Sequence, residues 1–379
     1  MKILILDQFS EPGGAQLCLR DLAPEIARRG WDATFMAPGA GAIGISLKEC
    51  GIRLEHLHGF SYANGRKSAS DALRYALDIP RALLRIRQFL KNNAPDIVYI
   101  NGPRLLPAGV MFPGPVVYHA HNHLVKTYAR LIAAACLRMK RVEVIAASQF
   151  AARALDGLIP ARRMRVLYSG VPDMHFAPQS DRNGAVRIGI IGRIAPEKGH
   201  LELIRAAKLL LERGHEIEIT VYGASMFSAA GYEAQVRSEA AGIPVQFAGW
   251  TQDVAKALHE IDLLAVPSAA IEAAGRVIME ALSAGTPVVA YPSGGIPELI
   301  RHGRTGLLCE ESTPESLART IATLLANPAL AGRIAQAGRK EWESRFHVER
   351  YRREVCDLFE ALVEKAVREE APHDKAPAD

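Results

Sequence analysis

Short, mostly apolar runs alternate with amphipathic segments along nearly the whole chain. The runs have the length of buried strands, and segments such as Gln16–Arg29, Asp71–Asn92 and Gln149–Gly157 repeat apolar residues at helical spacing. Strands that alternate with helices predict parallel sheets with helices on both faces. The predicted strands are Met1–Leu6, Ala33–Met36, Ile97–Ile100, Val116–His119 and Val144–Ala147, then Val186–Ile191, Glu218–Tyr222, Val245–Phe247, Asp262–Val266 and Pro287–Ala290.

The alternation is interrupted once and then restarts, which predicts two domains. The interruption is the polar stretch Gln179–Gly184, which follows Val171-Pro172-Asp173. A chain of 379 residues is also longer than one typical core supports. We therefore predict an α/β chain with two Rossmann-like, doubly wound parallel-sheet domains. The expected divisions are a first domain at 1–172, a linker at 173–185, a second domain at 186–345, a last helix at 346–368 and a disordered tail at 369–379.

The composition is that of an ordinary globular protein, with 49% apolar and 23% charged residues. No apolar run is long enough to span a bilayer, and the first strand meets Asp7 too soon to be a signal peptide. The five cysteines are scattered without metal-ligand spacing, which predicts core thiols in a reducing cytoplasm. Residues 1–180 balance at +10 and the remainder at −5, giving +5 overall. The basic first half predicts an anionic partner there.

Two carboxylates flank a turn of small residues in the second half of the chain. Glu272 precedes the turn, and Glu280 lies inside the amphipathic helix that follows it. The amides near Gly275, Arg276 and Val277 stand at the start of this helix, where free N–H groups and the helix dipole favour an anion. Carboxylates accept hydrogen bonds from hydroxyl groups. The combination suits a ligand with a phosphate between hydroxylated rings, as in a nucleotide sugar.

These residues belong to a longer pattern. The helix is followed by a small-Gly-x-Pro-Val-Val run at 284–289 and a Gly-Gly-x-x-Glu turn at 294–298. With Glu272 and Glu280 at this separation, the segment resembles the retaining glycosyltransferases of the GT-B fold, specifically glycosyltransferase family 4. That family often has Phe or Tyr where this chain has Ala274. The resemblance implies two Rossmann-like domains facing a cleft, with the C-terminal helix crossing back onto the first domain.

The same resemblance implies an activity. The chain would move a hexosyl unit from a nucleoside diphosphate sugar to an acceptor hydroxyl, with retention of the anomeric configuration. Glu280 would accept hydrogen bonds from the ribose, and Glu272 would act in catalysis by holding hydroxyls of the sugar. The expected setting is the assembly of a polysaccharide, a lipopolysaccharide or a glycolipid, with a glycan or lipid-linked acceptor.

A second candidate element follows the first strand of the second domain. Arg193 comes directly after that strand, and Lys198 follows it in a Lys-Gly pair. In the resembling family, Arg and Lys at these places hold the donor diphosphate. Fixed cations there stabilise the charge that grows on the departing nucleoside diphosphate. The chain has no obvious Asp-x-Asp metal site, so we expect metal-independent transfer without a cofactor.

Two strand ends of the first domain carry further candidates. Gly13 and Gly14 stand at a strand-to-helix turn, where backbone amides can approach a ligand closely. Gly14 is expected to contact the donor, whereas Gly13 either contacts the ligand or is required for a positive φ. His121 and Asn122 follow one predicted strand, and Asn101 closes the strand before it. Ligands bind at the carboxyl ends of parallel strands. The resemblance implies that His121 orients the donor sugar or the acceptor, while Asn101, Asn122 and Gly13 are candidates for lining the cleft.

One predicted helix, Asp71–Asn92, is rich in basic residues and contains Pro80, which is expected to interrupt it. It either lies on an anionic membrane surface at the inner face of the membrane or is a solvated helix face. A nucleic-acid partner is not expected. Its basic residues are Arg74, Arg81, Arg85, Arg87 and Lys91.

Two alternatives to glycosyl transfer stay open at the level of sequence. A nucleotide-sugar epimerase of GT-B architecture would bind the same donor, and its product would form without an acceptor. A non-catalytic nucleotide-sugar-binding protein should have lost either the glutamates or the Arg and Lys, and all are present. A nicotinamide dehydrogenase requires Gly-x-Gly-x-x-Gly after the first strand, and the Gly13-Gly14 turn does not supply it.

Overall fold

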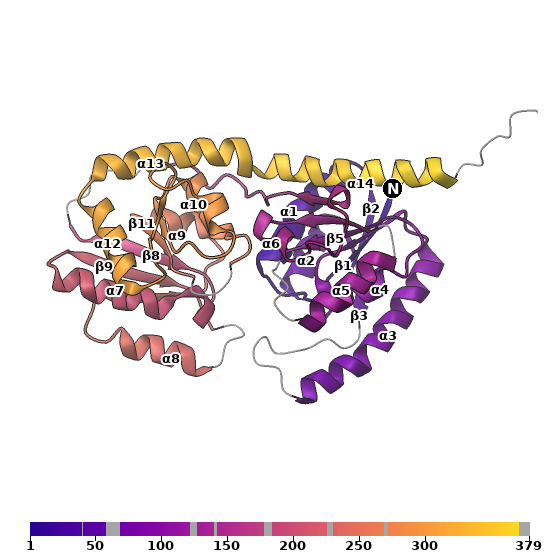
Figure 1. Cartoon of the computed structure of the whole chain (residues 1–379), viewed down its shortest axis with the longest axis horizontal. Helices are drawn as coiled ribbons and strands as arrows, with labels where there is room; N and C mark the ends of the chain where they lie inside the picture. Colours follow the sequence, from indigo (N-terminus) through magenta and orange to yellow (C-terminus); the bar gives the residue numbers. More distant parts are fainter. Residues whose placement is uncertain are drawn as a thin grey trace, which may run out of the picture.

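The computed structural model describes residues 1–39, 41–57, 69–121, 127–139, 142–177, 184–225, 230–268 and 272–370. They form two α/β domains side by side, joined along one edge by the last two helices (Figure 1). The strands and helices of the first domain are β1 Lys2–Leu6, α1 Gly14–Arg28, β2 Asp32–Pro38, α2 Ala42–Glu49, β3 Arg53–Leu57, α3 Ala69–Asn93, β4 Ile97–Ile100, α4 Leu106–Gly109, β5 Val116–Ala120, α5 Thr127–Met139, β6 Val142–Ala146, α6 Gln149–Arg153 and β7 Met164–Val166.

The second domain and the C-terminal segment follow the same alternation. A one-turn 3-10 helix, Pro196–Lys198, precedes the first helix of this domain, and a π-helical turn, Trp342–Phe346, precedes the last helix of the chain. The other elements are β8 Val186–Ile191, α7 His200–Glu212, β9 Ile217–Tyr222, α8 Ala230–Glu239, β10 Val245–Gly249, α9 Val254–His259, β11 Leu263–Val266, α10 Arg276–Ala284, β12 Val288–Ala290, α11 Ile296–Leu299, β13 Leu307–Leu308, α12 Pro314–Leu325, α13 Pro328–Glu341 and α14 Val348–Glu370.

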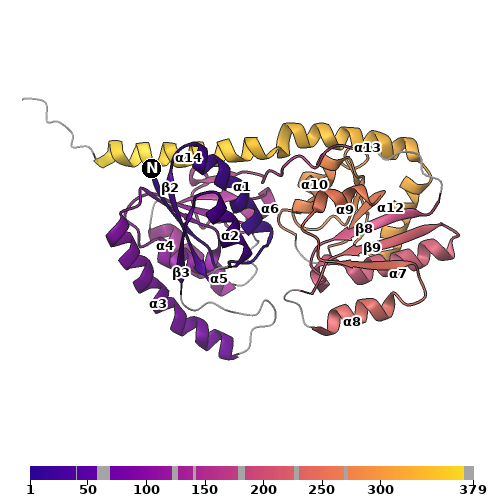
Figure 2. The ribbon, with the colours of Figure 1, turned by 180° about the vertical axis from the view of Figure 1, so that it is seen from behind.

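Both sheets are parallel, as the sequence pattern predicted. The first has the order β3-β2-β1-β4-β5-β6-β7 and the second β10-β9-β8-β11-β12-β13. Successive residues of a strand point to opposite faces. Ile3 and Ile5 are therefore buried with residues of α1 and α14, while Leu4 and Leu6 are buried with residues of α3, α4 and α5. In Figure 1, α4 and α5 lie in front of the first sheet. Figure 2 gives the opposite view, in which α1 and α2 lie in front of the same sheet.

The chain passes between the domains twice, at adjacent places. Val171 pairs with His347 in a parallel bridge, and the Val171 N–H donates to the Phe346 carbonyl at 2.9 Å. Gly170 is required here because a Cβ on it would lie 2.6 Å from the Cα of Val348. Beyond this point α14 covers the first domain and buries Tyr351, together with Val355 and Phe359, in its core. The C-terminal helix thus crosses back, as predicted.

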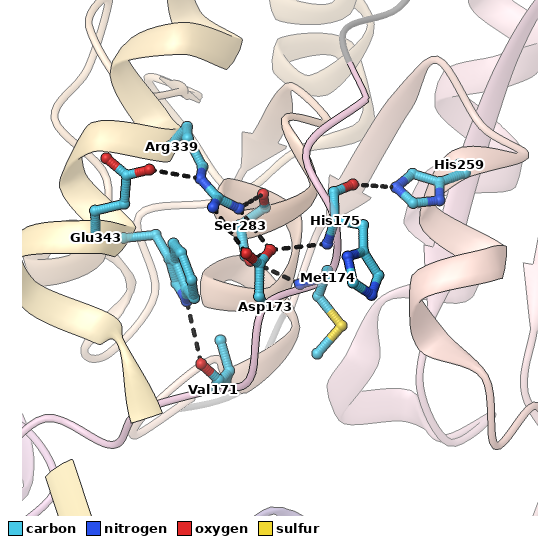
Figure 3. Close-up of polar contacts among 9 residues, drawn as sticks. Val171, Asp173, Met174, His175, His259, Ser283, Arg339 and Glu343 are labelled. Carbon is cyan, nitrogen blue, oxygen red and sulfur yellow. Dashed lines mark hydrogen bonds and ion pairs between the residues drawn. The ribbon is translucent and has the colours of Figure 1, made fainter. Parts of the chain in front are cut away.

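The described part of the segment after this crossing is attached to the second domain. Asp173 accepts hydrogen bonds from Arg339 Nη1 at 2.6 Å and Nη2 at 2.8 Å (Figure 3). The Met174 N–H donates to Ser283 Oγ at 2.9 Å, and the indole N–H of Trp342 donates to the Val171 carbonyl at 3.2 Å. Residues 173–177 are therefore bonded to the second domain, and the Ala177 N–H also donates to the Ala284 carbonyl at 3.1 Å.

Three local predictions were wrong. The predicted helix 149–157 ends at Arg153, because the chain turns and reaches Gly157 with φ of +75°. α3 continues through Pro80 rather than stopping there. The edge strands β3, β7 and β13 were not predicted, since they are short or polar. Among helices in the described ranges, none has the length and apolar character that crossing a bilayer requires. The predicted tail began at 369, but residues 369 and 370 belong to α14, and the rest of the predicted tail lies outside the described residues.

Candidate functional site

Lys198 and Glu272 are direct partners in the second domain. Lys198 ends the 3-10 turn after β8, and Glu272 follows β11, the neighbouring strand. Lys198 Nζ donates to Glu272 Oε2 at 2.5 Å, with the two side chains 29% and 20% exposed. The sequence placed both in the site from separate motifs, and the structure brings them together at the carboxyl ends of two adjacent strands.

Glycines allow the backbone around this pair to pack closely. Gly199 has φ of +77°, and a Cβ there would lie 1.8 Å from the Pro267 carbonyl oxygen. Gly294 has φ of +59°, and its Cβ would lie 2.2 Å from the Glu272 carbonyl oxygen. The Gly295 N–H donates to that same oxygen at 2.7 Å. The Gly-Gly-x-x-Glu turn therefore supports the backbone that carries Glu272.

The N-cap residue of α10 lies three positions after Glu272. Gly275 caps the helix in the left-handed region, with φ of +33° and ψ of 52°. Arg276 and Val277 are the first residues of the helix, where backbone N–H groups have no partner within the helix and the dipole is positive. These amides are placed to receive an anion, as the sequence suggested.

The side chain of Arg276 faces the other domain. Its Nε donates to Glu280 Oε1 at 2.8 Å, and its Nη1 lies 2.8 Å from Asp21 Oδ2 on α1 of the first domain. All three side chains are buried. Burial raises the pKa of Glu280, and the guanidinium of Arg276 opposes that rise. Arg276 thus joins the predicted ribose-binding carboxylate to the first domain. Asp21 was missed because nothing local marks it.

Arg193 lies at the end of β8 beside the 3-10 turn. Its Nη2 donates to Glu197 Oε1 at 3.1 Å, and both side chains are about half-exposed. Surface pairs of this kind hold a side chain weakly. Arg193 is therefore not brought into the Lys198–Glu272 contact by the structure, although it lies on the same loop as Lys198.

A second polar cluster lies at the carboxyl ends of β1, β4 and β5. Asp7 is fully buried and accepts hydrogen bonds from the Gln16 amide at 3.0 Å, from Asn101 Nδ2 at 2.6 Å and from the Phe9 N–H at 2.9 Å. The oxygen of Asn101 lies 2.7 Å from His121 Nε2. The structure brings the predicted Asn101 and His121 together and adds Asp7 and Gln16, which the sequence analysis missed. The sequence signal that could have identified Asp7 is a charged residue directly after a buried strand.

Burial controls the protonation of this cluster. It raises the pKa of Asp7 to about 7, against four hydrogen bonds that favour the charged form, from the side chains of Asn101 and Gln16 and the backbone of Phe9 and Gln8. Burial also lowers the pKa of His121 to about 3, so this imidazole is neutral near pH 7. Near pH 7, His121 is therefore uncharged and Asp7 is near the midpoint of its titration.

The raised pKa of Asp7 predicts a pH-dependent stability. The folded state binds this proton more tightly than the unfolded state, so stability is gained below pH 3.8 and lost as pH rises toward 7. A pKa shift of this size corresponds to about 4 kcal/mol in the free energy of unfolding. The free energy of unfolding of the wild type, relative to Asp7→Asn, should fall by most of this amount between pH 4 and 7. Asp32→Asn, at a half-exposed surface pair with Arg53, is the control. A difference that stays constant with pH contradicts the prediction.

The Gly13-Gly14 turn does not have the positive φ that was one of the two explanations offered for Gly13. Gly13 is in the extended region with φ of −149°, and neither glycine has a positive φ. The requirement for positive φ was therefore wrong. Space explains Gly13, because a Cβ there would lie 2.7 Å from Gln16 Oε1. Gly14 begins α1 and has no atom within 4 Å of its Cβ position, which leaves its backbone open to approach.

The two clusters lie on facing surfaces of the domains. His121 follows β5, and Ala147 follows the neighbouring strand β6. The Ala147 N–H donates to the Ala120 carbonyl at 3.1 Å, which places these two strand ends side by side. The next residue, Ser148, places its Oγ 3.2 Å from the Cβ position of Gly295 in the turn under Glu272. Glu298 of that turn accepts hydrogen bonds at 2.7 Å each from the N–H groups of residues 149 and 150, which begin α6 of the first domain. This contact fixes how the domains meet.

Asn122 lies outside the described residues. Across the described ranges, no three His, Cys, Asp or Glu side chains are grouped to hold a metal ion.

Comparison with known proteins identifies the family. Two family models match the chain, Glycosyltransferase Family 4 over residues 12–174 and Glycosyl transferases group 1 over residues 175–341. The phosphatidyl-myo-inositol mannosyltransferase of Mycobacterium leprae is 27% identical, over 87% of this chain and 88% of that protein. The sulfoquinovosyl transferase of Arabidopsis thaliana is 28% identical, over 70% of this chain and 56% of that protein. HepE of Anabaena, solved in complex with UDP-glucose, is 26% identical and superposes with a TM-score of 0.79, over 96% of this chain and 100% of that one.

The chain therefore belongs to the family 4 glycosyltransferases and has the GT-B fold. Its relatives are sugar transferases, and they do not favour the epimerase or the non-catalytic binding protein.

Proposed function

We propose that this enzyme transfers a hexosyl unit from a nucleoside diphosphate sugar to an acceptor hydroxyl, with retention and without a metal ion. The observation that carries the proposal is the Lys198–Glu272 contact, three residues before the N-terminus of α10. The contact thereby joins a cation to the carboxylate that precedes the N–H groups at the start of α10. A diphosphate requires the cation and the N–H groups, and sugar hydroxyls require the carboxylate.

Each residue has a distinct part in this scheme. Lys198 has three N–H donors, of which Glu272 takes one, so the others are available to the diphosphate. Arg193 reaches the diphosphate by leaving its weak surface pair. Glu272 holds hydroxyls of the transferred sugar, Glu280 accepts from the ribose, and His121 orients the sugar or the acceptor.

Retention follows from a reaction on one face of the sugar. In this route the leaving phosphate takes the proton of the acceptor hydroxyl, and no nucleophilic side chain is needed. Arg193 and Lys198 supply the positive charge that a metal ion would otherwise provide. Transfer should therefore continue in excess EDTA, and the product should keep the anomeric configuration of the donor. A glycosyl group trapped on a carboxylate would contradict the one-face route, and loss of activity in EDTA would contradict metal independence.

The donor is tested by binding. UDP-glucose is the first choice, because HepE binds it at 26% identity over almost the whole of both chains. Thermal unfolding with UDP-glucose, GDP-mannose, ADP-glucose and the free nucleotides should show stabilisation by the true donor. At a hundredfold excess over Kd the gain is about 2.7 kcal/mol. Lys198→Met should abolish most of the shift, whereas Lys208→Met, at a surface pair with Glu239, should keep it. If no donor or free nucleotide shifts the transition of the wild type, the proposed function is wrong.

We further propose that the enzyme is cytoplasmic and meets a glycan or lipid-linked acceptor at the inner face of the membrane, through α3. Leu77 and Leu84 on this helix are 54% and 68% exposed, and Arg81 and Arg87 are exposed beside them. Arg81 has a long contact with Asp78, at 3.7 Å, whereas Arg85 is held by Glu55 at 2.5 Å. An exposed mixture of leucine and arginine suits the interface of an anionic membrane.

Replacing Arg81 and Arg87 by glutamine should weaken binding to vesicles that contain anionic phospholipid by about 2 kcal/mol, or about 30-fold. Co-sedimentation measures this change. Arg237→Gln on the second domain is the control and should leave binding unchanged. Equal binding of the double variant and the wild type would exclude α3 as the contact surface.

A further inference from the structure

We propose that Asp7, acting through Asn101, is a positioning residue that holds His121 as the neutral Nε2–H tautomer, so that Nδ1 is the hydrogen-bond acceptor of the ring. The use of that nitrogen in sugar transfer rests on the proposed function. The tautomer itself follows from the hydrogen bonds of the first domain.

The first step concerns Asp7. Its carboxyl group is surrounded by donors, namely the fixed N–H of Phe9, the amide of Gln16 and the amide of Asn101. Asp7 Oδ2 is only 2.6 Å from the Asn101 amide nitrogen. A carboxylate oxygen can only accept, so the atom of Asn101 that faces it must be the NH2 group.

The second step fixes the amide of Asn101. Its Nδ2 also donates to the backbone carbonyl of Ala15 at 3.2 Å, so two acceptors lie on the same side. An Asn amide is oriented by such partners. The amide oxygen must then point the other way, where it meets His121 Nε2 at 2.7 Å. An amide oxygen carries no hydrogen, so His121 must donate from Nε2.

The third step fixes the ring itself. The His121 ring lies on the ring of His119, with centroids 3.7 Å apart and planes tilted by 30°. His119 is fully buried, and its Nδ1 lies 2.6 Å from the hydroxyl of Tyr99. Burial also keeps His121 neutral, since it lowers the pKa to about 3. One neutral imidazole holds one ring proton, and with that proton on Nε2 the other nitrogen is an acceptor.

The arrangement belongs to the ionised carboxylate. Because the Phe9 N–H keeps an accepting oxygen at Oδ1, a proton on Asp7 would sit on Oδ2 and face Asn101, so the tautomer is measured above pH 7, where a carboxyl group with a pKa of about 7 is ionised. The consequence for a carbohydrate is specific. A sugar hydroxyl can donate or accept, and an Nδ1 acceptor requires it to donate, so the Asp7–Asn101–His121 chain selects the direction of that hydrogen bond.

The test is the tautomer measured by nitrogen NMR of protein with 15N-labelled histidine, without substrate. The His121 signals are assigned by their loss in His121→Gln. The wild type should show a protonated Nε2 and an unprotonated Nδ1. In Asp7→Asn the new amide must keep its oxygen on the fixed Phe9 N–H, which turns its NH2 toward Asn101. Asn101 should then reverse and the proton should move to Nδ1, while Asp32→Asn should leave the signals unchanged.

A protonated Nδ1 in the wild type overturns the inference without any variant. So does an unchanged tautomer in folded Asp7→Asn. Sugar transfer separates the two proposals. Asp7→Asn should lower kcat about tenfold, the loss of about one hydrogen bond, with little change in KM for the donor. If the tautomer is as stated but His121→Gln keeps full kcat, the role of His121 in transfer is wrong and the hydrogen-bond chain stands.

Discussion

Replacing Lys198 by methionine is expected to lower kcat/KM for sugar transfer by about 10²- to 10³-fold. The departing nucleoside diphosphate gains negative charge as the glycosidic bond breaks, and a fixed cation beside it stabilises the transition state more than the ground state. Methionine keeps the length of the side chain and removes the charge. It also leaves Glu272 without the partner that holds it at 2.5 Å. Steady-state kinetics with the donor found in the binding screen measures the change.

Two controls separate charge from packing. Lys208→Met removes a lysine from a surface pair on α7 of the same domain and should keep activity within about twofold. Lys198→Arg keeps the charge and should recover part of the loss. If Lys198→Met keeps kcat/KM within threefold of the wild type, as roughly half a kcal/mol would allow, Lys198 does not hold the leaving group.

Replacing Arg276 by methionine is expected to lower the free energy of unfolding by about 3–5 kcal/mol. Arg276 is buried between Asp21 of the first domain and Glu280 of its own helix, at 2.8 Å from each. Without the guanidinium, Glu280 would be left buried without its ion-pair partner, and Asp21 would keep the more distant Arg20, whose Nη2 lies 3.6 Å from its Oδ1. The cost of that burial, rather than the strength of either ion pair, sets the size of the effect. Urea unfolding at pH 7 measures it.

The variant that also carries Asp21→Asn and Glu280→Gln should recover much of this loss, because neutral amides are less costly to bury than charges. Arg368→Met is the matched control, since Arg368 pairs with Glu364 one turn away but is 81% exposed. Its effect should stay within about 0.5 kcal/mol. An Arg276→Met protein as stable as the wild type would show that Asp21 and Glu280 do not depend on this arginine.

The fold was largely predictable because its central strands are long enough and apolar enough to stand out. β4 is buried on both faces, as are β1 after Lys2 and β8 at residues 188–190, so each contains an apolar run between turns or helices. The edge strands were missed because they lack such an apolar run. β3 has only one fully buried residue, Leu57, and β13 has two residues in all. A strand that faces solvent and pairs on one side leaves little trace in the hydrophobic pattern.

The candidate site was predictable only where its residues follow a local pattern. Lys198, Glu272 and Gly275 each stand at the end of a strand or the start of a helix, and such positions can be read from sequence. Asp7 was not selected, because its burial and its contact with Asn101 depend on β1 and β4 being neighbours in the sheet. Asp21 depends on the meeting of two domains, since its partner lies 255 positions away at Arg276.

The sequence by itself determined two parallel-sheet domains, their family and the strand ends that carry the donor-binding candidates, because apolar periodicity and turn residues act over a few positions. Only the tertiary structure decided that Lys198 contacts Glu272, that Arg276 joins Glu280 to Asp21, and that Asp7 orients Asn101. Such contacts join residues from different strands or domains. Their geometry depends on sheet order and on the angle between the domains, and no local stretch of sequence contains either.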